Sequence, residues 1–173
     1  MFTPRRALIS LAAAAFAFAA MTSQAAETTF TAKLTGAAQL PDATNSKATG
    51  TLQLTIAADG KSVAYKLTVE NLDNASGADV HLGPPTMNGP LVVKLFPKGG
   101  STAKKGPFSG VLAEGSFDAG DLIGPMQGSP FADFIDELKA GNVYTNVHTN
   151  DGMDPPDSGP GDYRNGEIRG QLK

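Results

Sequence analysis

Apolar and polar residues alternate with a period of two along most of this chain, which is the pattern of half-buried β-strands. The clearest case is a hairpin, in which 52–56 and 63–69 each place apolar residues on one face and Asp59-Gly60 supplies the turn. A polar loop is predicted to follow over 71–77. The other segments with a strand pattern are 28–34, 78–82, 91–96, 108–117, 142–149 and 166–172.

One segment has a helical period instead. Its apolar residues fall at i, i+3, i+4 and i+7 from Phe131, and charged residues cover the opposite side. Ser129 is predicted as the N-cap, Pro130 as the first helical residue and Gly141 as the C′ residue. We therefore expect an all-β fold, an antiparallel Greek-key β-sandwich or partly closed barrel, with one short helix capping its core.

The first 25 residues have the pattern of a signal peptide. Arg5 and Arg6 precede an apolar stretch over 7–20, and Ser23-Gln24-Ala25 has small residues where signal peptidase cleaves. The apolar stretch is shorter than the roughly 20 residues that a membrane-spanning helix needs. We expect cleavage after Ala25, a single mature domain over 26–173 without a membrane span, and a periplasmic or secreted location.

The charge and the absence of cysteine argue against several classes of function. The formal net charge is −3, and removal of Arg5 and Arg6 makes the mature chain more acidic, which disfavours nucleic acid as a partner. The chain has no Cys, so neither a disulfide nor a thiol nucleophile is available, and it has no Gly-x-Ser-x-Gly motif. These features predict a non-enzymatic binding or structural module whose partner is an extracytoplasmic protein, a polysaccharide or a metal.

The only two histidines lie in two strand-like segments. Alternation places Asp79 and His81 on one face of 78–82, and places His148 on one face of 142–149. If these strands are neighbours, two imidazoles and a carboxylate meet, and Glu167 could reach them from the last strand. Such nitrogen and oxygen ligands suit zinc or copper(II). The alternative prediction is thus a periplasmic copper- or zinc-binding protein, and a weaker alternative is a metal-dependent enzyme on the same face.

A structural network is the competing interpretation of the same residues. In that case both histidines hydrogen-bond Asp79, Asn146, Glu167 and the backbone, and Arg169 forms an ion pair with Glu167.

A second candidate site lies between the last two predicted strands. Residues 150–165 are rich in Gly and Pro and carry carboxylates at intervals of three to five residues, namely Asp151, Asp154, Asp157 and Asp162. Oxygen-rich loops of this kind suit calcium, although the spacing does not match an EF-hand. A solvated surface loop is the alternative.

Three parts of the sequence resemble the CHRD domain, named after chordin. The segments 144–149 and 166–172 resemble the end of that domain, 78–81 and 88–92 resemble its centre, and 30–40 resembles its beginning. The resemblance is to the exported bacterial type and implies a β-sandwich related in architecture to copper–zinc superoxide dismutase. It implies no particular activity.

Two departures from the family pattern bear on the chemistry. Asp79 stands where the family usually has its first central histidine, and 150–165 is inserted where the family's tail is short. A dinuclear copper–zinc centre needs many more imidazoles than the two present here, so dismutase activity is not expected.

Overall fold

The computed structural model describes residues 28–173, so the predicted signal peptide over 1–25 lies outside the described residues. Eight strands pair through antiparallel ladders into one sheet of order β5-β4-β7-β8-β1-β2-β3-β6. The strands are β1 (Thr28–Thr35), β2 (Thr49–Ile56), β3 (Ser62–Asp73), β4 (Ala75–Leu82), β5 (Leu91–Phe96), β6 (Pro107–Asp118), β7 (Val143–Thr149) and β8 (Ile168–Gln171). Three short 3-10 helices are η1 (Gly36–Ala38), η2 (Ala119–Asp121) and η3 (Gly124–Met126).

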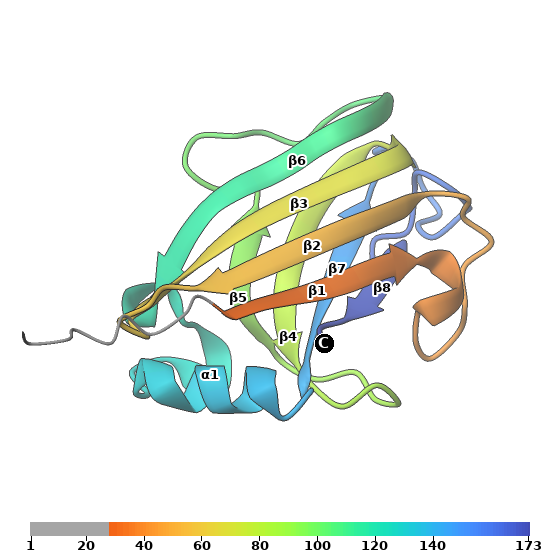
Figure 1. The fold of residues 1–173 in the computed structure, drawn as a ribbon. Coiled ribbons are helices and arrows are strands. Elements are labelled where there is room, and N and C mark those ends of the chain that lie inside the picture. Colours follow the sequence, from red (N-terminus) through yellow and green to blue (C-terminus); the bar gives the residue numbers. More distant parts are fainter. Residues whose placement is uncertain (1–27) are drawn as a thin grey trace, which may run out of the picture.

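The sheet curls until its two edge strands, β5 and β6, come into contact. In Figure 1, β6, β3, β2 and β1 lie in front, and β5, β4 and β7 lie behind them. No ladder joins β5 to β6 within residues 28–173, so the barrel is nearly but not fully closed. The predicted all-β antiparallel fold is confirmed, in its partly closed barrel form.

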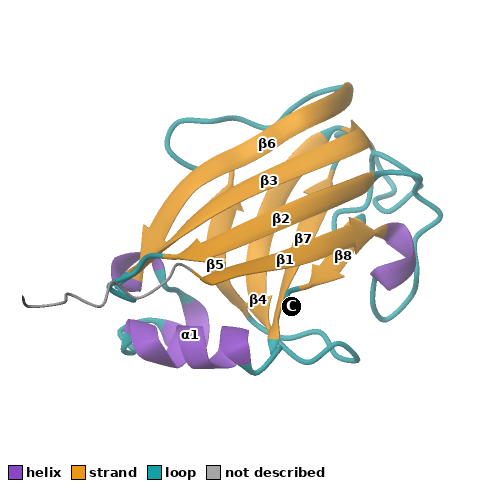
Figure 2. Cartoon of the chain, in the orientation of Figure 1, coloured by secondary structure: helices purple, strands orange, loops and turns teal. Residues whose placement is uncertain are grey.

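The inward-facing residues of the strands form one hydrophobic core. Leu52, Leu54 and Val63 in the predicted hairpin are fully buried, as alternation requires. The α-helix α1 (Phe131–Lys139) closes one end of the barrel (Figure 2). Its Phe134 packs edge-on against Phe117 of β6, with ring centroids 5.4 Å apart.

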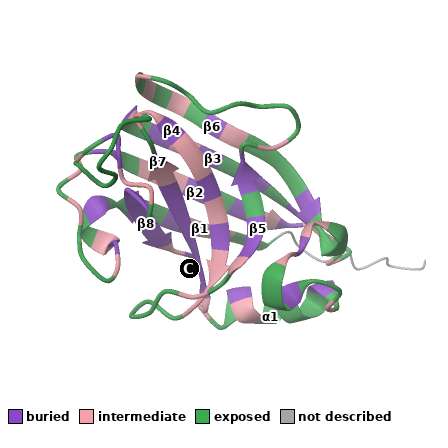
Figure 3. Ribbon diagram, turned by 180° about the vertical axis from the view of Figure 1, so that it is seen from behind, coloured by how far each residue is buried: buried purple, intermediate pink, exposed green. Residues whose placement is uncertain are grey.

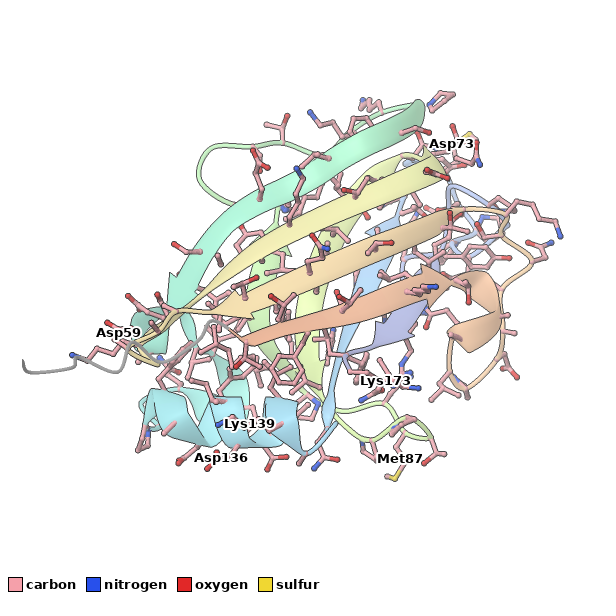
Figure 4. All side chains as sticks on the ribbon, in the orientation of Figure 1. Asp59, Asp73, Met87, Asp136, Lys139 and Lys173 are labelled. Carbon is pink, nitrogen blue, oxygen red and sulfur yellow. The ribbon has the colours of Figure 1, made fainter. Side chains whose placement is uncertain are left out.

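The helix begins one residue later than predicted. Pro130 is the N-cap and Phe131 the first helical residue, whereas Gly141 has the positive φ, 76°, of the expected C′ position. Asp136 and Lys139 are exposed to solvent (Figure 4). The helix thus caps the core, as its apolar stripe indicates.

The predicted polar loop over 71–77 is wrong. β3 continues to Asp73 and β4 begins at Ala75, so Asn74 alone connects them. Asn74 has φ 51°, and its side chain accepts a hydrogen bond from Gly106 N–H and donates one to the Gly161 carbonyl. A single left-handed residue, held by its own amide group, turns the chain across the barrel, and this is why polar residues here do not form a loop.

Candidate metal centre

The two histidines lie on neighbouring strands, because β4 pairs with β7. In this ladder Gly77 is opposite His148, Asp79 is opposite Asn146, and His81 is opposite Tyr144. Ala78, Val80 and Val147 face the core and are fully buried, so the polar side chains occupy the outer face. That face is partly covered: no residue of β4 is exposed, as its colouring in Figure 3 shows.

Asp79, His81 and His148 converge in space. One ligand atom from each lies within 4.8 Å of the other two, and His148 Nε2 is 3.5 Å from Asp79 Oδ2. Ligands of one tetrahedral zinc, each bonded at about 2.0–2.2 Å, lie about 3.4 Å apart. Side-chain shifts of about 1 Å would therefore bring the three residues into the first coordination shell of one ion.

Backbone carbonyls hold both imidazole rings. His81 Nδ1 is 3.0 Å from the Gly89 carbonyl oxygen, and His148 Nδ1 is 2.9 Å from that of Arg164. A carbonyl only accepts, so Nδ1 donates in each ring, and in the neutral imidazole the lone pair is then on Nε2. Nε2 of His81 is buried and has no hydrogen-bond partner among the residues that the structure describes. Metal-binding histidines typically use this arrangement, in which the second nitrogen is fixed by a carbonyl.

Burial disfavours the charged forms of two of the three groups. It raises the pKa of Asp79, while the neighbouring His148 and Lys94 oppose this shift. It lowers the pKa of His81, against the hydrogen bond to Gly89, and the charges of nearby residues lower it further. Without a ligand the site thus holds a desolvated carboxyl group and a neutral imidazole, and a bound cation would compensate the carboxylate's lost solvation.

Tyr144 holds the outer side of the site in place. Its ring stacks on that of His81, with centroids 4.9 Å apart and planes 12° apart, and the Arg169 guanidinium lies 3.9 Å from the same ring. The Tyr144 hydroxyl accepts from Gly89 N–H at 3.0 Å and donates to the Gly89 carbonyl at 3.2 Å. This fastens the 83–90 loop over His81. Alternation places Tyr144 on the histidine face, but no sequence pattern marks a residue that supports His81 by stacking.

The structure does not bring Glu167 into this group. Its buried carboxylate accepts hydrogen bonds from Ser46 Oγ at 2.5 Å, Thr149 Oγ1 at 2.5 Å and Gly161 N–H at 2.8 Å. β8 begins only at Ile168, so the alternation of that strand does not reach Glu167.

The expected network forms only in part. Arg169 makes no ion pair with Glu167 among the residues described; it donates instead to two carbonyl groups of the 83–90 loop. Asn146 accepts a hydrogen bond of 2.7 Å from Gln39 rather than bonding to a histidine. Neither side chain partners the free nitrogen of His81.

The carboxylates of the inserted loop have separate partners. No three of them come together as ligands within the part of the chain that the structure describes. Their partners are Met153 N–H for Asp151, Arg164 for Asp154, Asn165 for Asp157, and Ser158 with Arg164 for Asp162. These contacts fasten the loop to itself and do not form the predicted calcium cage.

Most of the chain matches a known protein family. The family model of the CHRD domain matches residues 30–156, well over half of the sequence. The chain belongs to the CHRD domain family. The match covers both histidines and ends inside the inserted loop, so β8 lies beyond it. No curated protein and no solved structure matches the chain significantly. The expected relationship to copper–zinc superoxide dismutase therefore stays a prediction.

No helix among residues 28–173 has the length and apolar character needed to cross a bilayer.

Proposed function

We propose that this CHRD domain is an exported, non-enzymatic binding module whose ligand is a divalent transition metal, zinc or copper(II). Asp79, His81 and His148 would hold the ion. The observation that supports this proposal is the buried Nε2 of His81, which has no hydrogen-bond partner within residues 28–173 and belongs to a cluster with a second imidazole and a carboxylate. Buried polar atoms are rarely left unpaired, and a purely structural network would use this one.

The donor set favours zinc or copper(II). Two imidazole nitrogens and one carboxylate oxygen match the ligand preferences of these ions. Calcium takes six to eight oxygens, and this cluster offers a single carboxylate. Copper(I) prefers thiolate or thioether sulfur, and the three residues of this cluster offer only nitrogen and oxygen.

Export and the absence of a nucleophile motif support the remaining parts of the proposal. The pattern over residues 1–25 favours delivery outside the cytoplasm, where a metal-binding module would meet exchangeable metal. The sequence offers no Cys and no nucleophile elbow. The weaker alternative, a metal-dependent enzyme, differs from the proposal by requiring turnover of a substrate.

Calorimetric titration of the purified, untagged, chelator-treated protein tests the metal site. We expect one equivalent of zinc or copper(II) to bind at micromolar concentration, and calcium not to bind. His81→Ala and His148→Ala should each lose this binding, whereas Glu114→Gln on the exposed face of β6 should bind like the wild type. At a metal concentration 100 times Kd, wild-type stability should rise by about 2.7 kcal/mol.

Two results would overturn the proposal. One is the absence of zinc or copper(II) binding by folded wild-type protein at micromolar metal. The other is unchanged affinity in both histidine variants while circular dichroism shows an intact β fold. In that case His81 and His148 serve only to hold strands and loops together.

A further inference from the structure

We infer that the metal keeps one coordination position open to a groove beside β4, and that this position takes a small oxyanion together with Lys94. The inference rests on the proposed metal site and names the class of small molecule that would bind there. This molecule carries a carboxylate or phosphate group that bridges the metal and the Lys94 ammonium.

The position of the groove determines which side of the metal is accessible. A groove of about 410 Å³ runs past the cluster, and its lining includes Asp79, His148, Lys94 and Arg164. His81 does not line it, because this ring lies beneath the 83–90 loop. Two of the three metal ligands thus face the groove, and an added ligand would enter from there.

Three protein ligands leave the coordination sphere incomplete. Zinc in proteins is almost always four-coordinate, and sites with three protein ligands take water or an added ligand as the fourth. Glu167, the remaining carboxylate predicted for the site, is unavailable because it already accepts three hydrogen bonds. The fourth ligand must therefore come from solution.

The charges at the groove favour an anion in that position. A divalent ion with one carboxylate ligand keeps a net positive charge. Lys94 lies opposite Asp79 in the β4–β5 ladder and has no ion-pair partner within residues 28–173. Arg164 differs, because Asp154 and Asp162 lie 3.5 and 3.6 Å from its guanidinium nitrogens. Metal binding would engage Asp79, the carboxylate that faces Lys94 across the ladder.

An oxyanion satisfies both positive groups at once. One oxygen would complete the coordination of a borderline metal, and a second would accept a hydrogen bond from the ammonium. A single-atom anion offers only the first contact. Carboxylate and phosphate groups share this chemistry, and the experiment below distinguishes them.

The test uses cobalt(II) as a spectroscopic substitute for zinc in the full protein. After cobalt binding has been measured in a non-coordinating buffer, acetate and inorganic phosphate are titrated separately while the visible absorption of the metal is recorded. We expect at least one anion to shift the spectrum with saturation, and the tighter of the two identifies the ligand class. Lys94→Met should weaken anion binding about tenfold.

The same variant should bind cobalt as tightly as the wild type or more tightly, because a nearby positive charge has been removed. The matched control is Lys66→Met, which removes an exposed lysine of β3 that lies 3.9 Å from Glu114. Lys66→Met should leave both affinities unchanged.

The outcomes separate this inference from the proposed function. If cobalt binds and neither anion shifts the spectrum, or if Lys94→Met titrates like the wild type, the oxyanion site is wrong and the metal site stands. If neither cobalt nor zinc binds, the proposed function is wrong and the oxyanion site falls with it.

Discussion

Two shielded carboxylates of this barrel have opposite surroundings. Glu167 accepts three hydrogen bonds of 2.5 to 2.8 Å. The carboxylate of Asp79 accepts none within residues 28–173, and His148 Nε2 lies 3.5 Å from it. A buried carboxylate with a full set of donors has little capacity left for a ligand, whereas one without donors is stabilised by a cation. The supply of donors, more than burial, separates a structural carboxylate from a candidate ligand.

The donors to Glu167 come from three distant parts of the chain. Ser46 lies in the connection between β1 and β2, Thr149 ends β7, and Gly161 lies in the inserted loop. Glu167 therefore fastens the inserted loop to the barrel. The loop, in turn, supplies the Arg164 carbonyl that holds His148. Glu167 thus supports the metal site through the loop without being a metal ligand itself.

Removal of Glu167 should have the largest effect on stability. Glu167→Ala leaves buried donors of three segments unpaired, and we expect the free energy of unfolding to fall by about 3 kcal/mol. Urea unfolding measures this loss, and Glu114→Ala, an exposed carboxylate of β6, should change stability by less than about 0.5 kcal/mol. A loss below about 1 kcal/mol for Glu167→Ala would contradict the structural role.

Asp79→Asn should have the opposite effects, weakening metal binding while leaving stability nearly unchanged. We expect zinc or copper(II) affinity to fall at least tenfold, because the only anionic ligand becomes neutral. The free energy of unfolding measured with chelator should stay within about 1 kcal/mol of wild type, since burial already disfavours the ionised carboxylate. Asp133→Asn on the outer side of α1 is the control and should alter neither quantity. A stability loss like that of Glu167→Ala would mean that the two carboxylates do not differ.

Tyr144→Phe should test how the 83–90 loop supports His81. The variant loses both hydrogen bonds between the hydroxyl and Gly89, and we expect about 1 kcal/mol less stability and several-fold weaker metal binding. Faster amide exchange at Gly89 would localise the change. Tyr163→Phe, whose hydroxyl makes one exposed bond to Asn45, is the matched control and should leave metal binding unchanged. Equal metal affinity in Tyr144→Phe and the wild type would show that the loop does not position the ring.

Loss of the ion pair between Lys98 and the half-buried carboxylate of Asp121 should have the smallest effect. The Lys98 ammonium, 2.8 Å away, lowers the pKa of Asp121, as does the Asp118 N–H, while partial burial opposes the shift. A depressed folded-state pKa stabilises the fold above the unfolded pKa of about 3.9, and this contribution disappears as pH falls through the folded value. We expect Lys98→Met to lower stability by about 0.2–1 kcal/mol at pH 7 and by nothing measurable near pH 2. A deficit that persists at acidic pH would assign the effect to packing.

Local periodicity was sufficient to predict the face of each site residue. Alternation placed Asp79 and His81 on one face and His148 on one face of its own strand. Successive side chains of a strand point to opposite faces, so every second residue shares a face. The same rule predicted the buried hairpin, and the apolar stripe from Phe131 predicted the capping helix within one residue.

Alternation failed for Glu167 because the last strand begins later than predicted. Glu167 lies one residue before β8, so the alternation of that strand does not apply to it, and its carboxylate meets the donors of three other segments. The predicted loop over 71–77 failed because Asn74 alone makes the turn. In both places contacts with residues distant in sequence decided the local backbone.

The sequence by itself determined that this is an antiparallel β protein with two histidines on polar strand faces, because those properties follow from the period of the chain. Only the tertiary structure decided that β4 lies beside β7, that two carbonyl groups fix the imidazole rings, and that Asp79 rather than Glu167 lacks donors. Strand order and hydrogen-bond supply depend on which distant segments meet. No local pattern encodes that meeting, because it results from closing the whole barrel around one core.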